Sequence, residues 1–305
     1  MKVYALAPGE SWVCDQLVQE WKTYTGDMAC ERVEDADLVW LLADWCWRSV
    51  PYGILSSKKV VTTVHHIVPA KFDRVARMDF AARDSITDLY HVYNQRAFDF
   101  IRPITAKPIT LAPYWANQNI WRPTVPRDEL RKKFGIPDGA FVAFSAQRDT
   151  EGSDLKSPKL EKGVDLLADA IINGYHKRHP NLHVLLAGWR RQYLIGRLTQ
   201  ANVPFTYIER PPQPTVNELY QCADLYPVCS REEGGPQSLL ECGLLGVPVV
   251  SRPVGIAEQV LPPSAINEDV LSATPAVPIV GSMTLPNGIE PYRRMFEEVM
   301  RLKRR

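Results

Sequence analysis

The sequence predicts an α/β protein of two domains, each built on a parallel β-sheet. Short apolar runs alternate with longer amphipathic segments along the chain, which is typical of βαβ units. The chain has 305 residues, enough for two domains of ordinary size. A stretch rich in proline, asparagine and tryptophan at residues 113–126 interrupts the alternation, which then restarts. We therefore expect two parallel-sheet domains joined by a linker.

The first half is predicted to hold several strands separated by helices. In a helix at residues 11–24, Val13, Leu17 and Trp21 recur every four positions and mark a buried face. Short apolar runs predict strands at residues 3–7, 37–43, 59–64, 89–93 and 108–112. Further helices are expected at residues 73–83 and 94–101. We assign residues 1–120 to an N-terminal domain.

The second half repeats this pattern. A charged helix at residues 127–134 is followed by the stop signals Gly135 and Pro137. Strands are predicted at residues 141–145, 183–187, 205–208, 225–229 and 247–251. Helices are predicted at residues 164–175, 190–200, 216–222, 237–245 and 289–303. We assign residues 121–288 to a C-terminal domain, and expect the segment 289–305 to pack back toward the N-terminal domain.

Composition and charge argue against several classes of protein. With 36 Lys and Arg against 35 Asp and Glu, the chain lacks the basic excess of a general nucleic-acid binder. Its six cysteines show neither CxxC pairs nor metal-finger spacing, so we expect buried, reduced thiols. No apolar run reaches the roughly 18 residues of a membrane span, and the N-terminus is typical of a strand rather than a signal peptide. We expect a cytoplasmic protein, although the basic run at residues 301–305 leaves a peripheral membrane contact open.

The most informative segment is residues 230–258. Glu233 follows a predicted strand, and Glu241 comes after seven intervening residues, about one turn into the next helix. The loop and helix start between them hold Gly234, Gly235, Pro236, Gln237 and Ser238. Unpaired amides and the helix dipole attract anions at such a helix start, so we expect a phosphate there. Because carboxylates would repel that phosphate, the two glutamates are expected to accept hydrogen bonds from neutral sugar hydroxyls.

This segment resembles the E-x7-E region of the retaining glycosyltransferases with the GT-B fold, particularly glycosyltransferase family 4 (GT4). The matching residues are Glu233, Gly234, Glu241, Gly246, Pro248, Val249, Val250, Gly255 and Glu258. The resemblance implies a GT-B fold, in which two Rossmann-like domains turn their parallel sheets toward a central cleft. It also implies that Glu233 faces the donor sugar as a catalytic residue and that Glu241 holds the ribose hydroxyls.

The resemblance extends to further donor-binding residues. Arg148 and Lys162 match the two cations that grip the donor diphosphate in the family, where positive charge stabilises the leaving group. The loop between them is longer than usual, so Lys159 remains an alternative to Lys162. Glu209 and Arg210 follow a strand at the place where the family binds the nucleobase.

Four other candidates follow predicted strands. His65 matches a histidine that reaches the donor sugar in the family, and His66 stands where the family often has an aspartate. Gly9 lies in the turn of residues 8–11, which weakly matches the family's first glycine-rich loop. Arg190 either reaches a phosphate or marks a solvated helix start. Two adjacent histidines without a third ligand do not predict a metal site.

The sequence therefore predicts a glycosyltransferase that uses a nucleotide-diphosphate sugar, with UDP- and GDP-sugars favoured. We expect transfer to a glycan, glycoprotein or small-molecule acceptor, with retention at the anomeric carbon and without metal or cofactor. Two alternatives remain open. A related epimerase or hydrolase of nucleotide sugars would need no acceptor, and a non-catalytic sugar-nucleotide-binding subunit would keep the scaffold without turnover.

Overall fold

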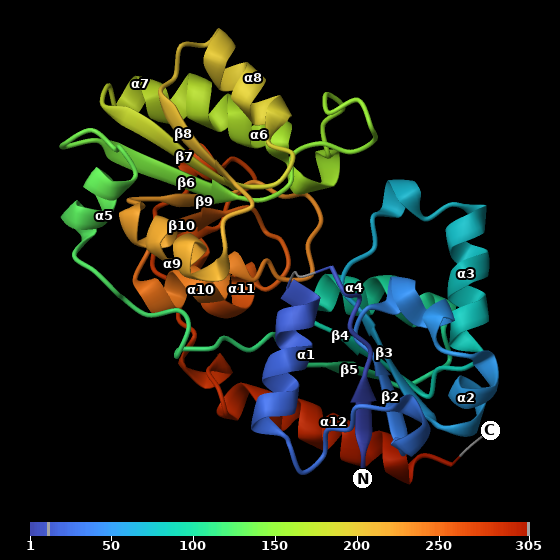
Figure 1. Cartoon of the computed structure of the whole chain (residues 1–305). Helices are drawn as coiled ribbons and strands as arrows, with labels where there is room; N and C mark the ends of the chain where they lie inside the picture. Colours follow the sequence, from blue (N-terminus) through green and yellow to red (C-terminus); the bar gives the residue numbers. More distant parts are fainter. Residues whose placement is uncertain (11–12, 304–305) are drawn as a thin grey trace. The chain divides into compact units, whose positions relative to one another are not determined.

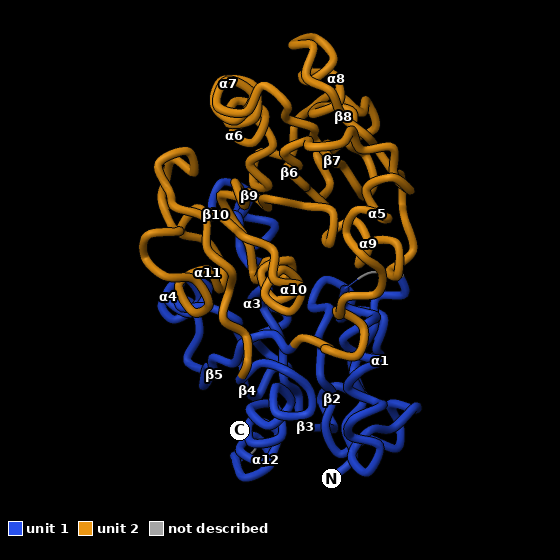
Figure 2. Tube along the Cα trace, turned by 90° about the vertical axis from the view of Figure 1, so that its left-hand side faces the viewer, with its two compact units in different colours: residues 1–115, 282–305 blue, residues 116–281 orange. Residues whose placement is uncertain are grey.

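The computed structural model describes residues 1–10 and 13–303, and the chain divides into two compact units. Unit 1 comprises residues 1–115 and 282–305, and unit 2 comprises residues 116–281 (Figure 2). The domain boundaries expected at 120 and 288 lie a few residues beyond these divisions. Ser11 of the predicted first turn, and Arg304 and Arg305 of the basic run, lie outside the described residues.

Unit 1 contains a parallel sheet in the order β1-β2-β3-β4-β5. Its strands are β1 (Val3–Ala5), β2 (Leu38–Leu41), β3 (Lys59–Val64), β4 (Leu89–Val92) and β5 (Ile109–Leu111) (Figure 1). Val3 also forms a parallel bridge with Ala29, on the edge of β1 opposite to β2. After β1 the chain therefore pairs first along one edge of β1, at Ala29, and then crosses to the opposite edge, where it forms β2. The topological switch point of this sheet therefore lies between β1 and β2, where open α/β sheets bind ligands at their carboxyl ends.

Helices cover both faces of this sheet. They are α1 (Val13–Tyr24), α2 (Tyr52–Ser57), α3 (Arg74–Asp84), α4 (Gln95–Ile101) and α12 (Glu290–Arg301). On one face, Trp40 of β2 makes edge contacts with Trp21 of α1 and Phe296 of α12. On the other face, Tyr90 of β4 stacks on Phe80 of α3. The C-terminal helix is thus part of the core of unit 1.

Unit 2 is a second doubly wound sheet. Its strands are β6 (Phe141–Ala146), β7 (Leu182–Gly188), β8 (Phe205–Glu209), β9 (Tyr226–Val228) and β10 (Val249–Ser251). The strands pair as β6-β7-β8 and β10-β9, and a parallel bridge from Ala143 to Leu225 joins the two sets. The resulting order β8-β7-β6-β9-β10 places the switch point between β6 and β9.

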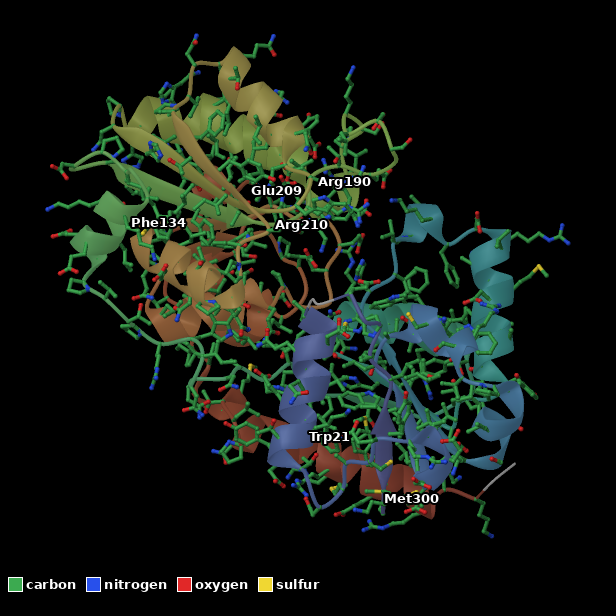
Figure 3. All side chains as sticks on the ribbon, viewed as in Figure 1. Trp21, Phe134, Arg190, Glu209, Arg210 and Met300 are labelled. Atoms are coloured by element: carbon green, nitrogen blue, oxygen red, sulfur yellow. The ribbon has the colours of Figure 1, made fainter. Side chains whose placement is uncertain are left out.

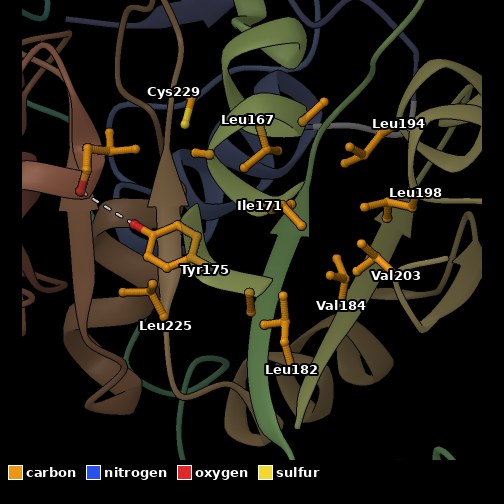
Figure 4. Close-up of a cluster of buried hydrophobic side chains, with 14 of the residues drawn as sticks. Leu167, Ile171, Tyr175, Leu182, Val184, Leu194, Leu198, Val203, Leu225 and Cys229 are labelled. Atoms are coloured by element: carbon orange, nitrogen blue, oxygen red, sulfur yellow. Dashed lines mark hydrogen bonds between the residues drawn. The ribbon is translucent and has the colours of Figure 1, made fainter. Parts of the chain in front are cut away.

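The core of unit 2 lies where helices pack against β6, β7 and β9. The helices of unit 2 are α5 (Arg127–Lys133), α6 (Val164–Asp169), α7 (His176–Arg178), α8 (Gln192–Gln200), α9 (Gln213–Cys222), α10 (Ser238–Leu245) and α11 (Ala257–Val260). Leu167, Ile171 and Leu194 are almost fully buried against the strands (Figure 4). The Tyr175 hydroxyl donates to the carbonyl of Val270 at 3.4 Å and closes one side of this core.

Every strand predicted from the sequence is present, with ends that differ by at most two residues. The helix expected at residues 164–175 is α-helical only to Asp169 and continues as a π-helix from Ala170 to Tyr175. The sequence analysis did not predict α2 and α11, which are short. All six cysteines are free; Cys30 and Cys46 are partly buried and the other four are buried. Among the described residues, no helix has the length and apolar character needed to cross a membrane.

Candidate functional site

The donor-site candidates of the sequence analysis gather at the carboxyl ends of the strands of unit 2. Arg148 lies two residues after the end of β6, and Glu233 lies in the loop after β9. These two strands flank the switch point of the sheet. In open α/β sheets consecutive crossovers diverge at the switch point, and ligands bind outside the strand ends there.

Lys162 and Glu233 form an ion pair at this switch point. The Lys162 Nζ lies 2.6 Å from Oε1 of Glu233, and the two side chains are only 22% and 12% exposed. The hydroxyl of Ser230 donates to the same carboxylate oxygen at 3.0 Å. Charge-assisted bonds of this length are strong and directional. The Glu233 carboxylate is therefore held by two donors from two different loops.

Backbone contacts tie these two loops together. The carbonyl of Glu161 accepts hydrogen bonds from the amides of Arg231 and Glu232, at 2.8 and 3.1 Å. The guanidinium of Arg231 reaches both carboxylate oxygens of Asp165 at 2.7 Å. The hydrogen bonds from Arg231 lower the pKa of Asp165. The position of Lys162 relative to Glu233 is thus fixed by the main chain as well as by the ion pair.

Two glycines allow the close approach of backbone segments around the site. Gly163 has a φ of +59°, and a Cβ there would lie 1.8 Å from the carbonyl oxygen of Cys229. Gly255 also has a φ of +59°, and a Cβ there would lie 1.4 Å from the carbonyl oxygen of Gly235. Side chains at these positions would force the loops apart. Gly163 therefore sets how closely the loop after β6 approaches the end of β9, and Gly255 how closely the loop after β10 approaches the loop after β9.

Helix α10 begins beside the Gly234–Gly235 loop. The carbonyl of Gln237 accepts from the amides of Leu240 and Glu241, at 2.9 and 3.2 Å. Just before this turn, the carbonyl of Gly235 accepts a hydrogen bond from the Ile256 amide at 2.6 Å. Among the described residues, no main-chain acceptor lies within hydrogen-bonding reach of the Ser238 amide. This donor marks the positive end of the helix dipole.

Glu241 lies in a different environment from Glu233. It is 9% exposed and sits on the inner side of α10, near Tyr220 of α9. Burial raises the pKa of Tyr220, and the charge of Glu241 raises it further. The two glutamates of the E-x7-E segment thus have different neighbours. Glu233 lies beside a lysine, and Glu241 lies beside buried tyrosines.

Three arginines surround Trp189, which follows β7 and is 40% exposed. The guanidinium carbons of Arg210, Arg148 and Arg190 lie 4.4, 5.3 and 5.4 Å from the indole centroid. Arg190, Glu209 and Arg210 lie close together where β7 and β8 end (Figure 3). The structure thus brings three predicted donor-site residues, Arg148, Arg190 and Arg210, onto one aromatic ring.

Arg190 has a structural role in this group. Its side chain is 8% exposed, and it donates to the carbonyl of Gly152 and, at 3.3 Å, to the hydroxyl of Thr150. Its φ of +61° is unusual for a residue with a side chain. These contacts fix the loop after β6, which carries Arg148 and Lys162.

The two alternative lysines of that loop have different partners. The Lys159 Nζ lies 3.7 Å from Glu161, whereas Lys162 pairs with Glu233. The Lys159 amide also donates to the carbonyl of Asp149 at 2.7 Å. Lys162 is therefore the cation that contacts the predicted catalytic carboxylate directly.

The remaining candidates lie in unit 1. His65 follows β3, and its Nε2 lies 2.8 Å from the carbonyl of Leu42. Because a carbonyl only accepts, this geometry assigns the proton to Nε2 and leaves Nδ1 to accept from the Tyr114 hydroxyl at 3.0 Å. His66 is partly buried beside it. Gly9 has a φ of +73°, and its amide donates to Asp15 at 2.8 Å.

Sequence reasoning missed two residues of the unit 2 site, Ser230 and Trp189. Ser230 directly follows the predicted strand at residues 225–229, so its position at a strand end was the available signal. Trp189 also follows a strand, but its contacts with Arg148 and Arg210 join it to residues 41 and 21 positions away in the chain. Among the described residues, no group of three His, Cys, Asp or Glu side chains could hold a metal ion.

Residues 155–272 match the family model of the glycosyl transferases group 1. This segment contains Lys159, Lys162, Glu209, Glu233 and Glu241, whereas Arg148 and His65 lie outside it. No curated protein sequence matches the chain.

Solved structures with the same fold cover nearly the whole chain. HepE from Anabaena, solved with UDP and glucose, is 14% identical with a TM-score of 0.75, over 98% of this chain and 99% of that one. A glycosyltransferase from Rickettsia africae is 12% identical with a TM-score of 0.66, over 99% and 98%. Sucrose-phosphate synthase from Thermosynechococcus elongatus is 17% identical with a TM-score of 0.60, over 93% and 75%. These likenesses confirm the predicted α/β fold with parallel sheets of the GT-B type.

Proposed function

We propose that this protein is a glycosyltransferase that moves a sugar from a nucleotide-diphosphate sugar to an acceptor, in the cytoplasm. Unit 2 binds the donor and unit 1 binds the acceptor. The observation that carries the proposal is the Lys162–Glu233 pair at the switch point of unit 2. The family match over residues 155–272 and the fold shared with HepE, which was solved with UDP and glucose, support it.

In this proposal the donor diphosphate binds between the loops after β6 and β9. Lys162 and Arg148 supply positive charge, and the start of α10 supplies the Ser238 and Gln237 amides. As the bond between sugar and phosphate breaks, negative charge develops on the diphosphate, and fixed cations and amides stabilise it. This stabilisation lets the leaving group depart without a metal ion.

Glu233 accepts hydrogen bonds from the sugar in this mechanism. When the diphosphate engages the Lys162 ammonium, the carboxylate remains oriented by the Ser230 hydroxyl, which lies 3.0 Å from it. A negative group beside an oxocarbenium-like transition state also stabilises its positive charge. The acceptor attacks the face from which the diphosphate leaves, which retains the anomeric configuration.

The rest of the nucleotide is assigned to residues farther along the same edge. Glu241 holds the ribose hydroxyls, and the segment of Glu209 and Arg210 after β8 holds the base. Either UDP or GDP is the favoured nucleotide. The exposed position of Glu209 at the carboxyl end of β8 agrees with this assignment.

The Lys162→Met variant tests the donor site. It replaces the ammonium with an apolar chain of similar length, so the affinity for a nucleoside diphosphate should fall about 30-fold, since a lost buried charge contact costs roughly 2 kcal/mol or more. Isothermal titration calorimetry with UDP, GDP and ADP measures this change. Lys156→Met is the matched control, because Lys156 is exposed on the same loop. If neither UDP, GDP nor ADP binds the native protein, the proposed function is wrong.

A further inference from the structure

A half-exposed tryptophan lies at the switch point of unit 1. Trp45 follows β2 and is 49% exposed. Its neighbours in the chain are anchored, because Asp44 pairs with Arg83 at 3.1 Å and Trp47 is 7% exposed. Trp45 carries the exposed indole of this turn, whereas the indole of Trp47 is buried. A large aromatic surface left exposed on an otherwise anchored turn is more informative than an isolated exposed aliphatic residue.

The indole of Trp45 rests on a fixed ring. Its centroid lies 5.6 Å from that of His65, with the planes inclined by 56°. His65 cannot turn freely, because Tyr114 and the carbonyl of Leu42 hold its two nitrogens. Trp45 is therefore preorganised, so little conformational entropy would be lost when a ligand covers it.

The loop after β1, which carries the Glu10 carboxylate, lies next to this turn. Glu10 is exposed, and its amide is held at 2.8 Å by Asp15. Burial raises the pKa of Cys46, next to Trp45, and the charges of Glu10 and Asp44 raise it further. Leu6, just after β1, packs in one cluster with Trp47 and Cys46 of this turn, so the loop that carries Glu10 lies beside it. The loops after β1 and β2 meet here on the two sides of the switch point.

The thiol of Cys14, in helix α1, also lies close to His65. Cys14 of α1 lies 3.8 Å from Nε2 of His65. Burial raises the pKa of Cys14 to about 12, and the charges of Asp15, Glu10 and Asp44 contribute. The contacts thus run from the β1 loop through Cys14 and His65 to Trp45.

We propose that Trp45 and Glu10 form a saccharide-binding subsite on unit 1. The indole face stacks on the C–H face of a pyranose ring, and the Glu10 carboxylate accepts hydrogen bonds from its hydroxyls. An aromatic platform beside carboxylates suits a neutral ligand that has both an apolar face and many hydroxyl donors. The inference rests on the proposed function and narrows the acceptor to one that carries a sugar ring.

Nuclear magnetic resonance of the tryptophan indoles tests this subsite in the full chain. The protein is labelled with 15N-tryptophan, the Trp45 signal is assigned with Trp45→Phe, and maltose, cellobiose and N,N′-diacetylchitobiose are titrated separately. At least one disaccharide should shift the Trp45 signal saturably at millimolar concentration. The Trp189 indole, 40% exposed on unit 2, is the internal control and should not shift.

Three variants test which side chains of unit 1 bind the disaccharide. Trp45→Ala should weaken binding of that disaccharide at least about 10-fold, measured by saturation-transfer difference, and Glu10→Gln about 3-fold. Tyr52→Ala, which removes another exposed aromatic ring of unit 1, should change nothing. If no disaccharide shifts Trp45, or if Trp45→Ala binds as well as the native chain, the inference is overturned.

Failure of the subsite can be distinguished from failure of the proposed function. Lys162→Met should lose nucleotide affinity while its disaccharide titration stays unchanged. If the native chain binds UDP or GDP but no disaccharide affects Trp45, only the saccharide subsite is wrong.

Discussion

The two units share a doubly wound parallel sheet but differ in the polar chemistry at their switch points. In unit 2, an ammonium and a carboxylate meet at 2.6 Å, and three arginines surround one indole. In unit 1, the imidazole of His65 bonds to a tyrosine hydroxyl and a main-chain carbonyl. The switch point of unit 2 centres on an ion pair and arginines, whereas His65 in unit 1 is held by a hydroxyl and a carbonyl.

This difference shows that the fold sets the position of a ligand site, whereas the side chains set which ligand binds there. Both sheets present loops at the carboxyl ends of their strands, which sets where a ligand binds. The side chains set which ligand is bound, because fixed cations stabilise an anionic diphosphate, whereas aromatic and neutral groups suit a sugar. Substitutions in each unit test this comparison.

The largest effect is expected for Glu233→Gln in unit 2. Loss of the charge should lower kcat about 100- to 1,000-fold, as for removal of one preorganised group that stabilises a transition state. The affinity for UDP or GDP should change less than about 3-fold, because the cations remain. Steady-state kinetics and calorimetry separate the two effects. Glu232→Gln is the adjacent control, and full activity of Glu233→Gln would show that this carboxylate is not catalytic.

The next largest effect concerns the packing of the two loops of unit 2. In Gly163→Ala, the new Cβ would lie 1.8 Å from the carbonyl oxygen of Cys229 at a positive φ. We expect a loss of about 3 kcal/mol in the free energy of unfolding, from backbone strain and displaced loops. Urea denaturation measures it. Gly196→Ala in α8 meets no atom within 4 Å and should be neutral or stabilising by up to about 1 kcal/mol. Equal stabilities of the two variants would contradict the close approach.

A smaller effect should appear as a pH dependence in unit 1. Burial lowers the pKa of His91 to about 3, while its Nε2 bonds to the carbonyl of Ala112 at 3.0 Å. The unfolded chain binds a proton on this residue below about pH 6.5 and the folded chain does not, so stability falls as pH falls between these values. From pH 6.5 to 5, the His91 contribution should fall by about 1.5 kcal/mol.

Urea denaturation across this pH range, with His91→Gln as the comparison, measures the contribution of His91. The variant should show a shallower decline in stability toward low pH. Parallel curves for the native protein and the variant would show that His91 is protonated in the folded state.

The smallest effect is expected for Tyr114→Phe, which removes the hydroxyl that His65 Nδ1 accepts from at 3.0 Å. The free energy of unfolding should fall by about 1 kcal/mol, the usual net value of one hydrogen bond. Tyr52→Phe, at an exposed position on α2, should leave stability unchanged. A Tyr114→Phe protein as stable as the native one would show that the imidazole is held in another way.

The local pattern of the sequence predicted the secondary structure well, and some elements explain why. The run at residues 59–64 is apolar and β-branched, and β3 has the same bounds. By contrast, α2 and α11 are short, and so few residues give no clear helical period. The π-helical segment after Asp169 also has no local signature, because its residues continue the helical pattern of α6 without a break.

The sequence by itself determined the two α/β domains, and motif resemblance supplied the candidate residues of the E-x7-E segment, because both depend on residues close together in the chain. Only the tertiary structure decided which candidates meet. It paired Lys162 with Glu233 across 71 residues, placed Trp189 among three arginines, and gave His65 its internal partners. These contacts join the ends of strands that are distant in sequence, so they exist only once each sheet has assembled.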